Sequence, residues 1–178
     1  MAARPASLKV RALQWLAQRE HSPLELRGKL LRLLQDGQRR SAAAAGDGDP
    51  AAPDAEAAAA EVDALLEWLS QHGFLSQQRF VESRVQARQA RFGNLRIQRE
   101  LQQHGAVLDA PAREALHESE FDRAREVWRK KFGRTAAAPA DAAAAAAARL
   151  RQMRFLTGRG FSPEVIRRVL ARAGESDT

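Results

Sequence analysis

Hydrophobic residues recur every three or four positions along most of the chain, which is the spacing of amphipathic helices. Between residues 7 and 34 this pattern predicts two helices, broken near His21. Strand-forming residues are scarce, since the chain has no tyrosine and only two isoleucines, Ile97 and Ile166. The sequence therefore predicts an all-α protein. Further helices are expected within 61–73, 76–93, 94–105, 109–119, 120–133, 149–160 and 162–172.

Three of these helices are predicted to end on a glycine that follows a leucine by four positions. A glycine just beyond a helix can adopt the left-handed conformation, and the next residue then folds back onto the leucine one turn earlier. We therefore expect Gly73, Gly105 and Gly160 to end helices. The phrase occurs as LSQHGFL at 69–75, LQQHGAV at 101–107 and LTGRGFS at 156–162.

Serine and aspartate mark the predicted helix starts. The stretch HSPLE places Ser22 at an N-cap, a proline at the first helical position and Glu25 at the third, which is a capping box. The stretch FSPEV repeats this arrangement with Ser162, and Ser76 and Asp109 are expected to cap two further helices. Consecutive helices are thus separated by very short joints.

The predicted helices group into three consecutive three-helix units, which we expect to stack into an elongated, curved array. The second unit ends in a short helix after Asp109, and a separate helix from Glu120 opens the third unit. Two stretches poor in large apolar residues read as inserts, the first of them mobile. The units are 7–75, 76–118 and 119–173, the inserts lie at about 35–56 and 134–146, and 174–178 forms a flexible tail.

The residues needed for catalysis or metal binding do not converge in this sequence. There is no cysteine, no phosphate-binding glycine loop and no zinc-binding helix motif, so we expect no enzyme activity, no cofactor and no metal. The four histidines are far apart in sequence and are better explained as helix-end or surface residues. Glu114, Glu118 and Glu120 lie among arginines, with which they are expected to pair on a helix surface.

The chain carries a formal net charge of +7, with 25 arginines against 4 lysines. A coding sequence rich in G and C would explain the ratio of arginine to lysine but not the positive excess, which predicts attraction to polyanions. Several of the arginines recur at helical spacing, as Arg84, Arg88 and Arg91 do, and so form stripes along helix faces. One such stripe alone is more typical of a solvated helix face, and the accumulation of stripes is what favours contact with a polyanion. The candidate binding residues are Arg84, Arg88, Arg91, Arg96, Arg99, Arg125, Arg129, Lys130, Lys131, Arg151, Arg154, Arg167 and Arg168.

Most aromatic residues lie at core spacing, so packing is the preferred interpretation of Trp15, Trp68 and Trp128 over stacking on bases. Phe92, next to a glycine, is left open between the two. No apolar run approaches the roughly 20 residues of a membrane-spanning helix, and the first ten residues lack the apolar core of a signal peptide. We therefore expect a soluble cytoplasmic protein without membrane contact.

Four phrases, in this order along the chain, resemble the bacterial regulatory protein RecX family. The resemblance implies an array of three-helix units that binds the RecA recombinase filament on single-stranded DNA and mostly inhibits filament extension and strand exchange. After HGFL the family commonly has an acidic pair, whereas Ser76, Gln77 and Gln78 stand here. The phrases are REHSPLELRGKL, WLSQHGFLSQQRFVESRV, RFGNLRIQRELQQHGAV and RQMRFLTGRGFSPEVI.

Two functions remain open at this point. The first is a monomeric RecA-filament modulator that contacts single-stranded DNA and, weakly, double-stranded DNA. The second, which rests on charge alone, is a helical nucleic-acid-binding protein that acts without RecA. The second predicts an affinity for DNA that falls steeply with salt and no preference for the recombinase filament.

Overall fold

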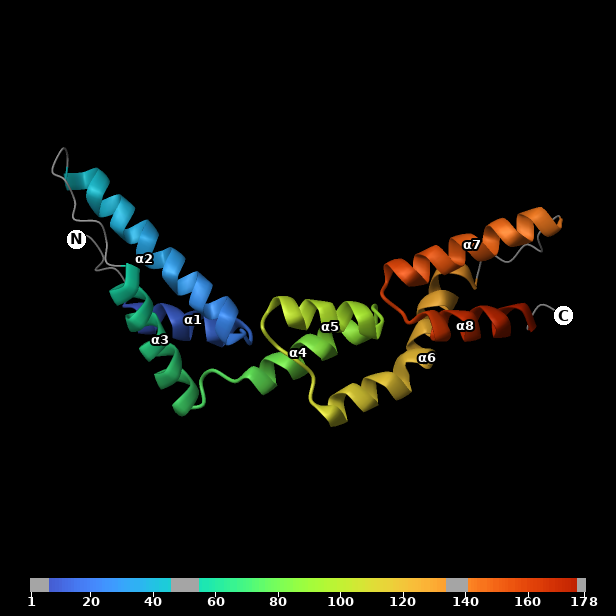
Figure 1. Ribbon diagram of the computed structural model, residues 1–178, viewed down its shortest axis with the longest axis horizontal. Helices are drawn as coiled ribbons and strands as arrows, with labels where there is room; N and C mark the ends of the chain where they lie inside the picture. The colour runs from blue at the N-terminus through green and yellow to red at the C-terminus, as the bar shows by residue number, and fades with distance from the viewer. Residues whose placement is uncertain (1–6, 46–54, 134–140, 176–178) are drawn as a thin grey trace. The chain divides into compact units, whose positions relative to one another are not determined.

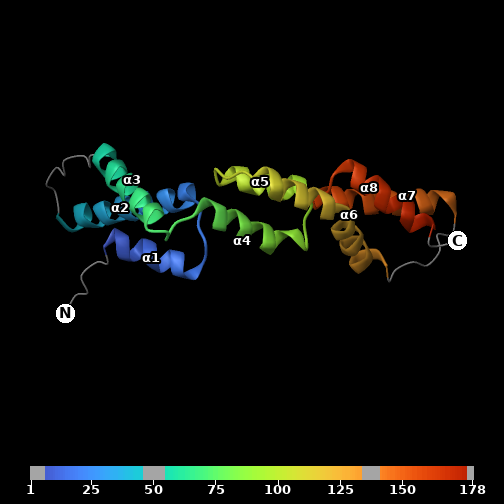
Figure 2. The same ribbon diagram turned by 90° about the horizontal axis from the view of Figure 1, so that it is seen from below.

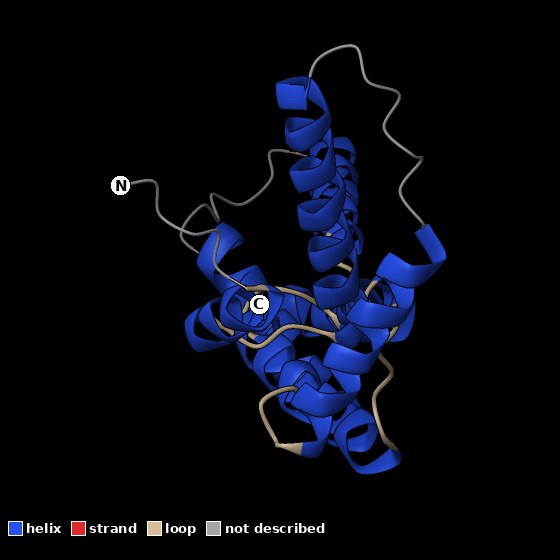
Figure 3. Cartoon of the chain, turned by 90° about the vertical axis from the view of Figure 1, so that its left-hand side faces the viewer, coloured by secondary structure: helices blue, strands red, loops and turns tan. Residues whose placement is uncertain are grey.

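The computed structural model describes residues 7–45, 55–133 and 141–175, and all secondary structure within these ranges is helical (Figures 1 and 3). The all-α prediction is thereby confirmed. By their contacts the residues form two compact units, Met1–Phe80 and Val81–Thr178. The helices are α1 (Leu8–Gln18), α2 (Pro23–Ala45), α3 (Ala55–Gln71), α4 (Gln77–Gln89), α5 (Asn94–Gln103), α6 (Ala110–Phe132), α7 (Ala142–Gly158) and α8 (Pro163–Glu175).

All three predicted glycine helix ends are confirmed. Gly73, Gly105 and Gly160 have φ angles of 74°, 66° and 77°, and within the described ranges they are the residues with positive φ. In each case the residue after the glycine donates its N–H to the predicted leucine carbonyl, at 2.9 Å, 2.9 Å and 3.3 Å. Leu69 and Leu101 are fully buried, as is the third leucine, so each turn anchors a helix end to a core.

The predicted caps also form, with one exception in detail. The side chains of Ser22, Ser76 and Asp109 accept hydrogen bonds from the backbone N–H three residues later, at 3.0 Å, 3.2 Å and 2.8 Å. The Ser162 hydroxyl instead donates to the carboxylate of Glu120, at 3.0 Å. The start of α8 is therefore satisfied by a side chain from another helix.

The expected break between a short helix after Asp109 and a new helix at Glu120 is wrong. One continuous helix, α6, runs from Ala110 to Phe132. No glycine or proline follows Pro111 within it, so nothing in the backbone interrupts a segment of good helix formers.

Helical structure also extends into both predicted inserts. Helix α2 continues to Ala45, α3 begins at Ala55 and α7 begins at Ala142. Alanine has the highest helix propensity, so a stretch without large apolar residues still forms helix beside a packed segment. Residues 46–54 and 134–140 of the two inserts, and 176–178 of the predicted tail, lie outside the described residues.

The unit Met1–Phe80 packs α1 and α3 against α2 (Figures 1 and 2). Its core contains Leu26, Leu30, Val62 and Leu69, each fully buried, and partly buried leucines and tryptophans pack around them. Burying one such leucine stabilises the fold by about 1.5–3 kcal/mol. On the surface, Arg27 of α2 pairs with Asp63 of α3, and this hydrogen bond lowers the pKa of the Asp63 carboxyl.

His21, at the joint between α1 and α2, is 1% exposed. Burial is the main cause that lowers its pKa below 6.5, and the positive charge of Arg19 adds to it, while Glu25 opposes the shift. The folded state thus binds a proton less readily than the unfolded state. Stability is complete above about pH 6.5, the unfolded pKa, and falls as the pH drops below it toward the folded pKa.

We therefore expect the free energy of unfolding of this unit to decrease between pH 7.5 and pH 5.5, chosen to bracket the unfolded pKa of 6.5. Urea denaturation followed by tryptophan fluorescence at each pH measures it. His21→Gln should flatten this dependence, whereas His117→Gln, at an exposed position on α6, should leave it intact. If the pH dependence of the free energy of unfolding persists in His21→Gln, groups other than His21 cause it.

The unit Val81–Thr178 packs α7 and α8 on the second half of α6, and these three helices lie side by side in both views (Figures 1 and 2). Phe161, Ile166 and Val169 of the α8 segment are buried against Ala124 and Val127 of α6. Helix α5 packs on the first half of α6. In this way α6 is shared by two groups of helices. No helix in the described part of the chain is long and apolar enough to span a membrane.

Candidate polyanion-binding surface

Four arginine side chains surround the ring of Phe92, which is 9% exposed. The guanidinium carbons of Arg96 and Arg159 lie 4.2 Å and 5.5 Å from the ring centroid, and those of Arg88 and Arg91 both lie at 5.8 Å. These distances are those of cation–π contacts. We call these five residues the Phe92 arginine cluster. Arg88 lies on α4 and Arg96 on α5, Arg91 and Phe92 lie in the joint between these helices, and Arg159 lies in the joint between α7 and α8.

Two glycines allow these distant segments to meet. The backbone N–H of Gly93 donates to the carbonyl of Arg159 at 2.9 Å, and that of Leu95 donates to the carbonyl of Gly160 at 3.1 Å. A Cβ atom on Gly93 would lie 2.3 Å from the Gly160 oxygen, and one on Gly160 would lie 2.5 Å from the Cβ of Arg96. The absence of both Cβ atoms therefore lets Arg159 approach the start of α5.

A buried carboxylate fixes the same joint. Glu120 is 1% exposed, and its Oε1 accepts hydrogen bonds from the backbone N–H of Asn94, at 2.9 Å, and of Ser162, at 3.2 Å. One side chain of α6 thus caps the starts of α5 and α8, where negative charge is favoured. The predicted surface role of Glu120 is wrong. The available signal was its place on the apolar stripe, between Leu116 and Ala124 at helical spacing.

Arg123 belongs to the same buried network, and its guanidinium holds backbone and side-chain oxygens of the neighbouring segment in place. Its guanidinium donates to the carbonyls of Phe92 and Gln89, at 2.8 Å and 3.2 Å, and to Oδ1 of Asn94 at 2.6 Å. Burial lowers the pKa of Arg123, and the charge of Glu120 opposes this shift. The side chain therefore satisfies carbonyls at the end of α4 and holds the segment that carries Phe92.

An open groove of about 460 Å³ adjoins the cluster, between α5 and the end of α7. Arg96, Arg99 and Glu100 line one part of it, and Thr157 and Gly158 line another. The Arg96 guanidinium contributes to both the cluster and the groove, because it also donates to the Gly158 carbonyl at 3.4 Å. The groove thus extends the positively charged surface along α5.

Among the described residues, Glu100 supplies the carboxylate that forms salt bridges with the arginines of this surface. It pairs with Arg88 at 2.9 Å and with Arg96 at 3.5 Å. Within the described ranges, Arg91, Arg99 and Arg159 form no salt bridge. The five arginines and this glutamate together carry a formal charge of +4. Such an excess favours an anionic ligand, and guanidinium groups match phosphate and carboxylate geometry.

The structure therefore brings together four of the predicted binding residues, Arg88, Arg91, Arg96 and Arg99. It adds Arg159, which was not among them. Arg84 lies on the same helix as Arg88, and its Nη2 is 3.2 Å from Nε2 of His104. The sequence shows only that Arg159 directly precedes the helix-ending Gly160. The residues that it contacts, such as Arg91, are far away in sequence, so no local pattern predicts its place in the cluster.

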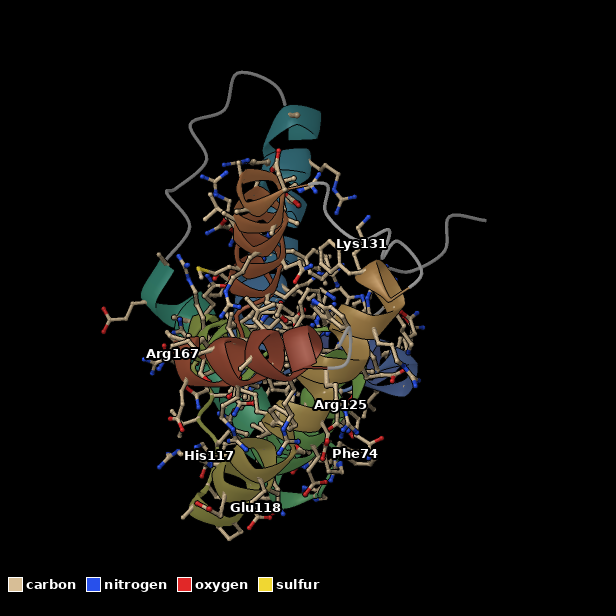
Figure 4. All side chains as sticks on the ribbon, turned by 90° about the vertical axis from the view of Figure 1, so that its right-hand side faces the viewer. Phe74, His117, Glu118, Arg125, Lys131 and Arg167 are labelled. Atoms are coloured by element: carbon tan, nitrogen blue, oxygen red, sulfur yellow. The ribbon has the colours of Figure 1, made fainter. Side chains whose placement is uncertain are left out.

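The other predicted residues are spread over α6, α7 and α8. Arg125 pairs with Asp122 at 3.3 Å, and Arg129 and Lys130 pair with Glu126 at 2.8 Å and 3.4 Å. These pairs within one exposed helix face fit the solvated-face interpretation. Arg125, Lys131 and Arg167 project from the ribbon at exposed positions (Figure 4). Arg151, Arg154 and Arg168 are also exposed, and Arg168 lies 4.7 Å from the ring centroid of Phe121.

The described residues contain no group of three histidine, aspartate or glutamate side chains that could hold a metal ion. The chemistry of the surface is that of anion binding by guanidinium groups.

Known proteins of one name are similar to this chain along nearly its whole length. The model of the third three-helix domain of RecX matches residues 118–170, close to the predicted third unit. A protein named regulatory protein RecX from Leptothrix cholodnii is 44% identical over 94% of this chain and 89% of its own length. Proteins of the same name from Herbaspirillum seropedicae and Herminiimonas arsenicoxydans are 43% and 39% identical, over 95% and 99% of this chain and 92% and 99% of their own lengths.

Proposed function

Because the chain belongs to the RecX family of regulatory proteins, we propose that it binds the RecA recombinase filament on single-stranded DNA and restrains filament extension, ATP hydrolysis and strand exchange. The observation that carries this proposal is the similarity to proteins named RecX along nearly the full length of both chains. The protein acts by binding, as a cytoplasmic monomer, and not by catalysis.

The Phe92 arginine cluster and the adjoining groove supply a physical basis for binding. Arg91 and Arg99 are exposed, and within the described ranges neither forms a salt bridge, so both can pair with an anion without breaking an existing ion pair. The anion in the filament is a phosphodiester of the bound strand or a carboxylate of the recombinase. Both accept two parallel hydrogen bonds from one guanidinium.

A second candidate function is nucleic-acid binding without RecA, which the net charge of +7 favours. The two functions differ in their preferred ligand. A filament modulator binds the RecA filament more tightly than the bare strand at the same salt concentration. A protein that binds through charge alone prefers neither, and its affinity for both falls steeply with salt.

We expect the double substitution Arg91→Gln and Arg99→Gln to weaken binding to the RecA filament and to bare single-stranded DNA. If each arginine neutralises one phosphate, the slope of log affinity against log salt concentration should become shallower by about 1.4, or about 0.7 per arginine on single strands. Fluorescence anisotropy of labelled DNA, with and without RecA, measures both quantities.

The matched control is the double substitution Arg125→Gln and Arg129→Gln, which removes the same charge from the exposed face of α6. Both arginines there are already paired with carboxylates, so we expect a much smaller change in slope. Equal losses in the two variants would contradict the assignment of binding to the Phe92 arginine cluster and the adjoining groove, and would favour attraction through net charge.

A further inference from the structure

Phe74 directly follows Gly73, the first of the three helix-ending glycines. Of the three residues that follow these glycines, it is the one whose side chain is exposed. In the second and third copies the residue after the glycine is buried, with Ala106 at 0% and Phe161 at 1% exposure. Phe74, in the same position of the same turn, is 46% exposed (Figure 4). The turn itself therefore does not require this aromatic ring to be exposed.

The exposed ring belongs to an ordered stack of aromatic side chains at the end of α3. The ring centroids of Trp68 and Phe74 are 5.8 Å apart, and their planes differ by 19°. The rings of Trp68 and His72 are 4.0 Å apart, and their planes differ by 25°. We name these three residues the Trp68 stack. Its nearly parallel rings are arranged as stacked aromatic pairs prefer.

Several contacts hold the stack in place. The Nδ1 atom of His72 lies 2.8 Å from the carbonyl of Trp68, which fixes the imidazole beside the indole. The Arg79 guanidinium donates to the Phe74 carbonyl at 3.1 Å and pairs with Glu20 at 2.8 Å. Because the stack is ordered before a ligand arrives, a planar ligand loses less binding energy to side-chain ordering.

One cation lies against the stack, and the exposed residues beside it in sequence are polar or charged. The Nζ atom of Lys9 lies 3.4 Å from the centroid of the Trp68 ring. The exposed residues that flank the stack in sequence include Glu67, which accepts a hydrogen bond from Gln71 at 3.1 Å, and the polar residues Ser70 and Gln78. An apolar helix is a poor ligand for this site, because Phe74 is a single exposed ring among polar residues. A planar group linked to a phosphate fits better, because the ring of Phe74 offers it a π-face and Lys9 offers the phosphate a positive charge.

We propose that the Trp68 stack binds an unpaired nucleobase of a single-stranded nucleic acid, which stacks on Phe74 while Lys9 approaches the neighbouring phosphate. This inference takes from the proposed function only the presence of a single strand as ligand. It assigns a base-stacking site to the unit Met1–Phe80, in addition to the phosphate-binding arginines of the other unit. Stacking on an aromatic side chain is tolerant of base identity, so the site does not select a sequence.

The test compares two short strands of equal length, oligothymidylate and the same strand with abasic residues. Both carry the same phosphates, so a difference in affinity reports the bases. We expect the full-length protein to bind oligothymidylate about 5- to 150-fold more tightly, the range that corresponds to stacking of one base. Phe74→Leu should bring this ratio close to one, because leucine is apolar but has no π-face, and Phe74→Tyr should preserve it.

Val107→Ala is the matched control, since Val107 is an apolar residue that is 72% exposed and lies outside the stack. It should leave the ratio unchanged, and thermal unfolding should show that all three variants are folded. Equal binding of the two strands by the wild-type protein overturns the proposal. A preference that Phe74→Leu retains also overturns it, and so does loss of filament binding alone in that variant, which would assign Phe74 to a protein contact.

The failure of the proposed function would look different. If the wild-type protein has no effect on RecA but still prefers oligothymidylate through Phe74, the base-stacking site stands and the filament-modulator function falls.

Discussion

Replacing Gly160 with alanine is expected to destabilise the unit Val81–Thr178 by about 3–5 kcal/mol, enough to remove most of the stability of a small domain. Two effects add at this position. The φ angle of 77° disfavours any residue with a Cβ atom. The added Cβ would also lie 2.5 Å from the Cβ and 2.7 Å from the backbone nitrogen of Arg96, so α5 would have to move.

Gly73 provides the matched control for this substitution. It ends a helix in the same way, with a φ angle of 74°, but no atom lies within 4 Å of an added Cβ. Gly73→Ala should therefore cost only the conformational strain, about 1–2 kcal/mol. Urea denaturation of both variants measures the difference. Equal losses would contradict the view that close backbone contact at Gly160 positions Arg96 and Arg159.

Replacing Glu120 with alanine is expected to cost about 3–5 kcal/mol, the loss typical of breaking a buried charged network. The substitution leaves the backbone N–H groups of Asn94 and Ser162 without their acceptor and leaves Arg123 beside no carboxylate. Glu120→Gln should cost less, because one amide oxygen still accepts these hydrogen bonds. Thermal and urea unfolding followed by circular dichroism measure both changes.

Glu118 on the same helix is the control, because its side chain is exposed (Figure 4). Glu118→Ala should change stability by no more than about 0.5 kcal/mol. If Glu120→Ala were equally mild, the carboxylate would not be the group that joins the starts of α5 and α8. A folded Glu120→Gln variant with weakened DNA binding would show that this joint also positions the Phe92 arginine cluster.

Helix starts and ends were predictable because their causes lie within a few residues in the sequence. Gly73 and Gly105 each follow a leucine by one helical turn, and Ser22 precedes the N–H that it caps. The family resemblance, now confirmed, rests on these same local phrases. The predicted break within α6 is wrong because the segment from Ala112 to Phe132 consists of residues that favour helix, and no glycine or proline interrupts it at the expected unit boundary.

The candidate site was only partly predictable, because its geometry depends on contacts between distant segments. Glu120 bonds to Asn94 and to Ser162 across separations of 26 and 42 residues, and no local pattern encodes both partners. Arg159 joins Arg91 across 68 residues for the same reason. Helical periodicity predicted which arginines share one helix face, but not which of them already have a carboxylate partner.

Phe92, left open by the sequence, is explained by the same contacts. Its ring is nearly buried and serves as the common neighbour of four guanidinium groups. Cation–π attraction there offsets part of the repulsion among the arginines. The ring therefore organises the surface and does not itself offer a face to a base, in contrast to Phe74.

The most direct test of the proposed function is the rate of RecA-dependent ATP hydrolysis on single-stranded DNA as the protein is added in increasing amounts. The account predicts a marked fall in rate at far less than one copy of the protein per RecA protomer, because under the proposed function one bound copy stops extension of a whole filament. An unchanged rate, under conditions in which the protein binds the bare strand, would contradict it.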